Sequence, residues 1–331
     1  MFKRSKAFAS LATVAALALT GCGASNSGGS SESSAAGNDP ATSKWAKCDM
    51  HEGVADVSSV SGEDKDKNVT IGAFNGWDES FATAHLLKAI LEKDGYTVDI
   101  KAFDAATGYT AVAEGDADFL TDTWLPVTHA DYLDKYGDKM DSLGCWYDNA
   151  KLTIAVNEDS PAKTIEDLGK MADEYDNTIV GIEPGAGLTK QTKEKAIPEY
   201  GLDKMNYTTS STPAMLAAIK KSQADGTNIA VTLWRPHWAY AAFPMRDLED
   251  PKGAMGGKEI VYSFATKGYE KEHPKVAQLV KNLVLDDETL ASLENVMFGD
   301  DQFAGKDNDA AVAQWLQENP DFADQLKTGK L

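Results

Sequence analysis

The stretch Val69-Thr70-Ile71-Gly72-Ala73-Phe74 predicts the first strand of the folded part of the chain. A helical spacing of apolar residues follows over Ser80 to Lys93, and Asp94-Gly95 ends this helix. The order then continues with a strand, a short helix and a strand over Tyr96 to Phe103, Tyr109 to Ala113 and Ala117 to Leu120. This βαβαβ order indicates a parallel sheet covered by helices.

A second α/β unit is predicted over about 151–239. Its predicted strands are Lys151 to Asn157, Thr178 to Ile182 and Asn228 to Leu233. The last third returns to a strand at Glu259 to Ala265 and then to helices. Because the chain crosses twice between the units, we expect residues 45–150 and 240–331 to form one lobe and 151–239 the other. The expected fold class is α/β, with two doubly wound lobes and a ligand cleft between them.

Composition excludes several classes of protein. The chain has 331 residues, of which 42% are hydrophobic and 25% charged, as in ordinary globular proteins. Its net charge of −20 lacks the basic footprint that a nucleic-acid binder needs. No CxxC, HxxxH or HExxH pattern occurs. We therefore expect no zinc site, no other metal and no cofactor.

Residues 1–21 are typical of a signal peptide. Three basic residues precede an apolar run from Ala7 to Leu19, which is too short for a comfortable membrane span. Leu19-Thr20-Gly21-Cys22 resembles the bacterial lipobox, in which cleavage precedes a lipidated cysteine. We expect Cys22 to carry a lipid and residues 22–44 to form a flexible Ser/Gly/Ala tether on the extracytoplasmic face of a membrane. The alternative is an ordinary secretory signal with an incidental cysteine.

The two remaining cysteines, Cys48 and Cys145, are expected to form a disulfide because that compartment is oxidising. The bridge would close a loop of about 97 residues, which the chain-entropy relation values at roughly 3–5 kcal/mol. The alternative is a pair of buried free thiols.

Tryptophans follow predicted strands in both units. They are Trp77, Trp124 and Trp234, and a further candidate, Trp146, lies beside Tyr147 near the crossing between the units. Ligands of open α/β sheets bind beyond the carboxyl ends of the strands, so these rings could line the cleft as an aromatic cage. A quaternary ammonium has no N–H group to donate, but indole faces attract it through the ring quadrupole. Core or rim packing is the alternative for each tryptophan.

Groups suited to an anion lie in the same loops. Gly185-Ala186-Gly187 precedes a predicted helix, whose free N–H groups favour a carboxylate, although the segment equally suits a plain turn. His237 and His129 follow Trp234 and Trp124 closely, and each could donate to a carboxylate or be a structural histidine. Such a set suits a zwitterion with a quaternary ammonium at one end.

Three segments carry a resemblance to a known family: Trp124-Leu125-Pro126-Val127-Thr128-His129, Val180-Gly181-Ile182-Glu183-Pro184-Gly185-Ala186-Gly187 and Thr232-Leu233-Trp234-Arg235-Pro236-His237-Trp238. Together they resemble the substrate-binding proteins of bacterial ABC transporters for glycine betaine, proline betaine, carnitine and choline. The resemblance extends over about residues 67–270. It implies a bilobed type II periplasmic-binding fold, a permease as partner, a small quaternary-ammonium ligand and no enzymatic activity.

The resemblance also implies a cation box of three or four aromatic residues. Trp124 and Trp234 match the cage, Trp77 matches the aromatic residue after the first strand, and Trp146 or Tyr147 would supply the remaining wall. His237 matches the histidine often placed near the ligand carboxylate.

Other residues leave the identity of the ligand undecided. Arg235 stands where a smaller polar residue is expected, and Asp78 and Asp122 could face a cation, which would favour choline over a zwitterion. A receptor for an amino acid or polyamine would instead need several carboxylates in the cleft. A secreted enzyme is the third hypothesis, but no GxSxG pattern or metal triad accompanies the carboxylates.

Overall fold

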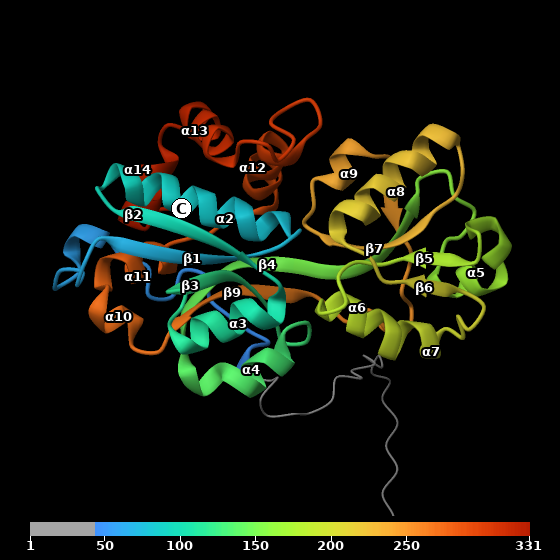
Figure 1. The fold of residues 1–331 in the computed structure, drawn as a ribbon, viewed down its shortest axis with the longest axis horizontal. Helices are drawn as coiled ribbons and strands as arrows, with labels where there is room; N and C mark the ends of the chain where they lie inside the picture. The colour runs from blue at the N-terminus through green and yellow to red at the C-terminus, as the bar shows by residue number, and fades with distance from the viewer. Residues whose placement is uncertain (1–43) are drawn as a thin grey trace, which may run out of the picture. The chain divides into compact units, whose positions relative to one another are not determined.

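The computed structural model describes residues 44–331 (Figure 1). The predicted signal peptide, the predicted lipidation site at Cys22 and nearly all of the predicted tether lie outside the described residues. Between residues 44 and 331, no helix combines the length and the apolar character that a membrane crossing requires.

The first sheet contains the predicted βαβαβ unit. Its parallel strands are β1 (Asn68–Phe74), β2 (Thr97–Phe103) and β3 (Phe119–Leu125), and the connecting helices are α2 (Asp78–Lys93) and α3 (Ala105–Glu114). β9 (Glu259–Thr266) pairs antiparallel with β3 and with β4 (Met140–Asn157). The sheet is thus mixed rather than purely parallel, because β9 returns from the other half of the molecule and runs against β3.

The second sheet begins on the far half of β4, which at 18 residues is long enough to pair in both sheets. Its other strands are β5 (Thr178–Val180), β6 (Asn206–Thr208), β7 (Ala230–Arg235) and β8 (Met245–Asp247). β7 and β8 pair antiparallel with β4, and β5 lies parallel to β6 and β7. The strand order through both sheets is β2-β1-β3-β9-β4-β7-β5-β6.

Helices flank both sheets (Figure 1). Around the second sheet they are α5 (Ile165–Lys170), α6 (Gly187–Gln191), α7 (Ile197–Glu199), α8 (Thr212–Asp225) and α9 (Ala239–Ala242). Beside the first sheet lie α4 (Ala130–Tyr136), α10 (Tyr269–Glu272), α11 (Pro274–Lys281), α12 (Asp287–Phe298), α13 (Asn308–Glu318) and α14 (Phe322–Thr328). Short 3-10 turns at Val57–Ser59, Gly137–Lys139 and Ala172–Tyr175 and a π-helical turn at Thr192–Ala196 complete the regular structure.

The C-terminal helices cover the predicted first unit, since α12 and α13 both pack on α2. We call the unit around the first sheet the first lobe and the unit around the second sheet the second lobe. The predicted lobe boundaries remain a prediction. Because β8 pairs with β4 and Ile165 N–H donates to the carbonyl oxygen of Glu249, we propose that the second lobe extends past residue 239 to about 256.

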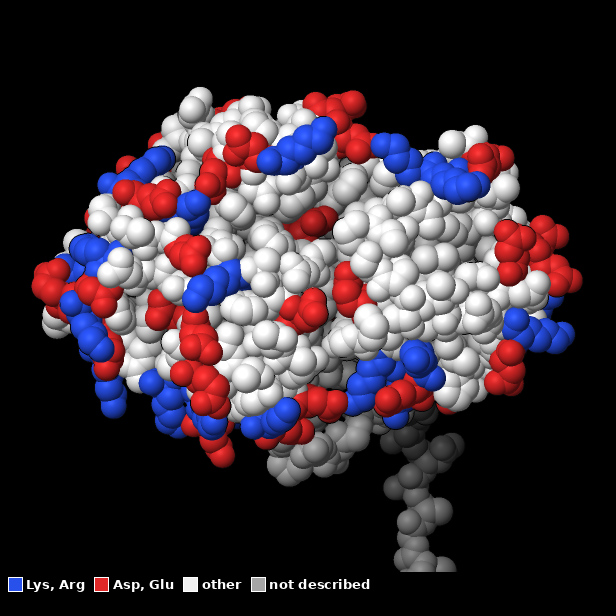
Figure 2. Space-filling model, in the orientation of Figure 1, with Lys and Arg blue, Asp and Glu red and all other residues white. Residues whose placement is uncertain are grey.

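Charged side chains of both signs lie on the surface. On the face of residues 44–331 that Figure 2 shows, acidic and basic side chains are interspersed, with no broad basic patch. This face therefore presents no footprint for a nucleic-acid backbone.

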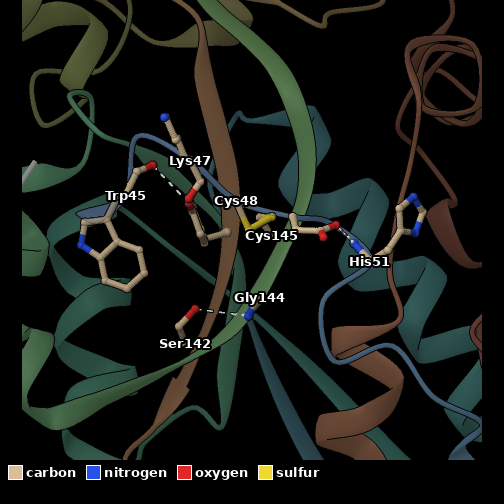
Figure 3. Close-up of a disulfide and its surroundings, with 9 residues drawn as sticks. Trp45, Lys47, Cys48, His51, Ser142, Gly144 and Cys145 are labelled. Carbon is tan, nitrogen blue, oxygen red and sulfur yellow. Dashed lines mark hydrogen bonds between the residues drawn. A yellow bond between two sulfur atoms is a disulfide. The ribbon is translucent and has the colours of Figure 1, made fainter. Parts of the chain in front are cut away.

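The beginning of the described chain is tied to the first sheet (Figure 3). Cys48 and Cys145, the two cysteines expected to pair, are joined by a disulfide with 6.4 Å between their Cα atoms. The Trp45 ring packs edge-on against Tyr262 and Phe264 of β9, with centroids 5.2 and 5.3 Å away. Tyr262 Oη also donates to the carbonyl oxygen of Trp45. The segment is thus held by a covalent bond to β4 and by packing on β9.

Removing this bridge is expected to destabilise the fold. In the Cys48→Ala/Cys145→Ala variant the free energy of unfolding should fall by about 3–5 kcal/mol, because the bridge closes a loop of 97 residues. Urea unfolding followed by circular dichroism measures the difference, and the reduced wild-type protein is the matched comparison. A loss below about 1 kcal/mol would show that the bridge does not restrict the unfolded chain as the chain-entropy relation requires.

Candidate functional site

Three of the predicted tryptophans meet at one cavity between the lobes. Trp77 and Trp124 reach it from the first lobe, and Trp234 reaches it from the second. The cavity, together with the solvent into which it opens, has about 290 Å³ of space not occupied by atoms. The other lining residues are Glu79, Thr128, His129, Leu152, Ile182, Ala186, Gly187 and Leu188.

Each of these tryptophans lies at or just after the end of a strand, as the sequence predicts. Trp124 is the next-to-last residue of β3, and Trp234 is the next-to-last residue of β7. Trp77 follows β1 and is the N-cap residue of α2. All three are buried, with 7% or less of each residue exposed. Strand ends from two sheets therefore place the indoles around one small space.

The N–H groups of two of these indoles are held by carboxylates. Trp124 Nε1–H donates to Asp122 Oδ1 (2.7 Å), and Trp234 Nε1–H donates to Glu79 Oε2 (3.1 Å). The second bond joins the lobes, because Glu79 is in the first turn of α2 and Trp234 is on β7. These bonds fix the orientation of both rings.

Trp77 is arranged differently. Its ring stacks on His129, with centroids 5.3 Å apart and an interplanar angle of 9°, and it also contacts Phe74 at 4.9 Å. Its Nε1–H is buried and has no hydrogen-bond partner among the described residues. Trp77, which lines the cavity, therefore has an unused N–H donor.

His129 offers a second unused donor. The backbone N–H of Trp124 donates to His129 Nδ1 (2.9 Å), so the ring proton is assigned to Nε2. Nε2 is buried without a partner among the described residues. Burial lowers the pKa of His129 to about 3, so the ring is neutral at pH 7. It presents an N–H group without adding a positive charge that would repel a cationic ligand.

His237 lies behind Trp234 and is not among the residues that line the cavity. Its ring packs edge-on to Trp234 with centroids 4.6 Å apart, and its Nδ1 accepts from the backbone N–H of Ala239 (3.0 Å). Burial lowers its pKa to about 3. Its Nε2 has no hydrogen-bond partner among residues 44–331 and lies 3.9 Å from Asp78 Oδ2.

Of the predicted segment Gly185-Ala186-Gly187, only the last two residues line the cavity. Ala186 is the N-cap residue of α6, which begins at Gly187. The carbonyl oxygen of Gly185 instead accepts a hydrogen bond from Tyr132 Oη of α4 (3.0 Å), a second contact between the lobes.

The loop after Trp124 is held by Glu259 at the start of β9. The backbone N–H groups of Val127 and Thr128 both donate to Glu259 Oε2 at 2.9 Å, and the Thr128 hydroxyl donates to Oε1. Burial raises the pKa of Glu259, and these three donors partly offset the shift. A single carboxylate thus fixes the loop between Trp124 and His129.

The structure does not bring Trp146 or Tyr147 to the cavity. Both face the interior of the first lobe from the middle of β4, where they are at most 3% exposed. Trp146 Nε1–H donates to the carbonyl oxygen of Thr121 (2.5 Å), and Tyr147 Oη donates to Asp287 of α12 (2.6 Å). Arg235 also stays outside, because its Nε donates to Asp247 (2.8 Å) and its guanidinium lies 3.6 Å from the Tyr240 ring centroid.

Sequence reasoning did not assign Glu79, Trp238 or Glu294 to the site. Trp238 Nε1–H donates to Asp78 Oδ2 (2.5 Å), which adds a further contact between the lobes. Glu79 follows Trp77 by two residues, and that proximity is a signal that could have found it. Glu294 lies fully buried on α12, and no local pattern distinguishes it from the surface acids of that helix.

Comparison with known proteins identifies a matching family and a similar curated protein. Residues 67–318 match the family described as the substrate binding domain of the ABC-type glycine betaine transport system. The chain is 34% identical over 164 residues to the glycine betaine/carnitine transport binding protein GbuC of Listeria monocytogenes, which covers 49% of this chain and 52% of that protein. It thus spans about half the length of this curated relative.

Solved structures extend the comparison over most of the chain. Lactococcal OpuAC in its closed conformation with glycine betaine is 31% identical, covers 79% of this chain and 99% of its own, and has a TM-score of 0.72. A choline binding protein in complex with choline is 27% identical, covers 80% of this chain and 92% of its own, and has a TM-score of 0.70. These likenesses confirm the predicted two-lobed α/β fold.

Proposed function

The chain belongs to the family of substrate-binding domains of ABC-type glycine betaine transport systems, and from this membership we propose that it captures a quaternary-ammonium solute and delivers it to a membrane permease. The observation that carries the proposal is the meeting of Trp124 and Trp234, from different lobes, at one cavity. A ligand that contacts both rings stabilises the closed arrangement of the lobes, so binding becomes a shift in population that a permease can recognise.

In the proposed complex the trimethylammonium group lies between the faces of Trp124 and Trp234. Neutral rings attract it at up to about 2 kcal/mol for each desolvated contact. A cage of rings also fits a ligand without N–H groups better than a cage of carboxylates, which would bind most strongly to donors. This point favours a betaine over an amino acid or polyamine.

The proposed site for a ligand carboxylate is the set of unused donors. Trp77 Nε1–H and His129 Nε2–H belong to residues that line the cavity, and neither has a partner among the described residues. Ala186 and Gly187 offer backbone N–H groups on the side of the second lobe. His237 and Gly185 would act indirectly, by supporting Trp234 and by joining α6 to α4.

We further propose that the protein works outside the cytoplasm, held to the membrane by a lipid on Cys22. The support is the sequence pattern alone, because Cys22 lies outside the described residues. A tether of roughly 20 residues gives the folded part a reach of about 25 Å. Capture without chemical conversion suits such a receptor, so we expect no turnover of the ligand.

Choline is the second candidate ligand. Glu79 lines the cavity and accepts a hydrogen bond from Trp234, so an acidic group stands beside the proposed cation site. A cation without its own carboxylate would gain more from this group than a zwitterion would.

A titration tests the proposal. The protein lacking residues 1–22 would be titrated with glycine betaine, carnitine and choline while its tryptophan fluorescence is followed, and calorimetry would confirm the affinities. A saturable change at micromolar concentration is expected with at least one of the three, and the ligand should be recovered unchanged after long incubation. No response to any of them, or a response only to a polyamine or amino acid, would contradict the proposal.

A further inference from the structure

Three buried carboxyl groups and one partly exposed carboxyl group, that of Asp78, lie beside the cavity. Asp78 and Glu79 come from the first turn of α2, Asp122 comes from β3, and Glu294 comes from α12. Glu79 lines the cavity itself. Glu79 is 2% exposed, and Asp122 and Glu294 are fully buried. All four belong to the first lobe.

The partners of these groups are neutral donors. Asp78, Glu79 and Asp122 each accept one indole N–H, from Trp238, Trp234 and Trp124 in turn. Asp122 Oδ2 and both oxygens of Glu294 have no hydrogen-bond partner among the described residues. The Ser80 hydroxyl and the Trp238 backbone N–H lie close enough to lower the pKa values of Asp122 and Glu294 in part.

No cation within residues 44–331 neutralises this cluster. None of the four carboxylates forms an ion pair with a lysine or arginine of the described chain. The one basic side chain aimed at them is His237, whose buried Nε2 has no hydrogen-bond partner there and lies 3.9 Å from Asp78 Oδ2. Burial keeps that ring neutral, and the same holds for His129 at the cavity.

Four negative charges in this water-poor region, with no cation to neutralise them, would be very costly, so the cluster favours retaining protons. Burial raises the pKa values of Asp78 and Asp122 to about 7. Burial, with the charges of its carboxylate neighbours, raises the pKa values of Glu79 and Glu294 well above the ordinary value. Near neutral pH the proton count of the cluster is therefore sensitive to any charge placed in the cavity.

We propose that Asp78, Glu79, Asp122 and Glu294 form a proton-sharing set that distinguishes ligands by net charge, so that a cationic quaternary ammonium releases a proton from the set and a zwitterion does not. The inference rests on the proposed function, because it places the ligand cation between Trp124 and Trp234. A cation there stabilises the ionised form of Glu79, and the displaced proton passes to solvent. A zwitterion carries its own carboxylate, which offsets the same field.

Calorimetry with choline and glycine betaine tests this inference. Each ligand would be titrated at pH 7 in two buffers of different ionisation enthalpy, which gives the number of protons exchanged on binding. Choline is expected to release about 0.5 to 1 proton more than glycine betaine. Because protons leave on binding, choline affinity should rise with pH between 6 and 8, by up to about tenfold per unit, while glycine betaine affinity changes less.

Two variants on one helix sharpen the test. Glu294→Gln removes a buried carboxyl group that makes no hydrogen bond to the described residues, and it should reduce the difference in proton count between the ligands. Glu288→Gln removes an exposed carboxylate from the first turn of α12 and should leave the difference unchanged. The wild-type measurement stands on its own if Glu294→Gln does not fold.

The outcomes separate the two proposals. Equal proton counts for choline and glycine betaine would overturn the proton-sharing set while leaving the receptor function intact. If only one ligand binds, the number of protons released on its binding tests the inference. The inference requires that choline releases protons and that glycine betaine does not. If neither ligand binds, the proposed function fails and this inference fails with it.

Discussion

Replacing Trp124 by alanine is expected to weaken the binding of a quaternary-ammonium ligand by about 30-fold, and replacing Trp234 as well should bring the loss to about 1000-fold. The estimate takes about 2 kcal/mol for each desolvated contact between cation and ring. The two rings belong to different lobes, so the double variant removes the walls that we propose enclose the cation from both sides. Titration followed by calorimetry measures the losses, since the fluorescence signal changes with the tryptophan content.

Two matched variants separate lost ring contacts from general damage. Trp124→Phe keeps an aromatic face and should lose less affinity than Trp124→Ala, although the indole donor to Asp122 is gone. Trp45→Phe changes a ring that packs on Tyr262 and Phe264 and does not line the cavity, so affinity should stay at the wild-type value. Unchanged affinity in a folded Trp124→Ala/Trp234→Ala protein would contradict the proposed cage.

Replacing Gly187 by alanine is expected to weaken binding of any cleft ligand by tenfold or more, because it obstructs the approach of the lobes. A Cβ atom at this position would lie 2.2 Å from the carbonyl oxygen of Thr128 and 2.6 Å from its Cγ2. Real Cβ atoms essentially never approach so closely. Thr128 is not free to move aside, because Glu259 accepts hydrogen bonds from its backbone N–H and its hydroxyl.

The clash exists only where the lobes meet, so the thermal stability of the ligand-free Gly187→Ala protein should change little. Gly137→Ala is the matched control, because its Cβ atom would meet only Leu133 Cδ1 at an ordinary 3.8 Å. Calorimetry with the ligand that the wild-type protein binds measures the affinity of both variants. Wild-type affinity in Gly187→Ala would show that the close approach of Gly187 to Thr128 is not needed for binding.

Much of the fold follows from local pattern. The βαβαβ unit, the second α/β unit and the return strand near residue 259 were all predictable, because burial on one helix face or within a sheet imposes a period on the sequence. The length of β4 was not predictable. Its first half contains register shifts between Ser142 and Ala150, which disrupt regular pairing and hide the strand from a periodicity argument.

Only part of the strand order could be predicted from the sequence. Short strands such as β6 and β8 have three residues each, too few to show a period. β9 is inserted between β3 and β4 as an antiparallel strand, a placement that depends on where the chain returns after the second lobe. Such placement is decided by packing between distant segments and not by the residues of the strand itself.

By itself, the sequence determined the two α/β units and the three strand-end tryptophans that meet at the cavity, because each depends on residues close together in the chain. Only the tertiary structure separated Trp77 from Trp146, since both are tryptophans near strands but Trp146 turns into the interior of the first lobe. It alone paired Glu79 with Trp234 across 155 residues and buried Glu294 beside them. Local periodicity carries no information about such partners. Desolvation, which sets the protonation of these carboxyl groups, depends on every segment that excludes water from them.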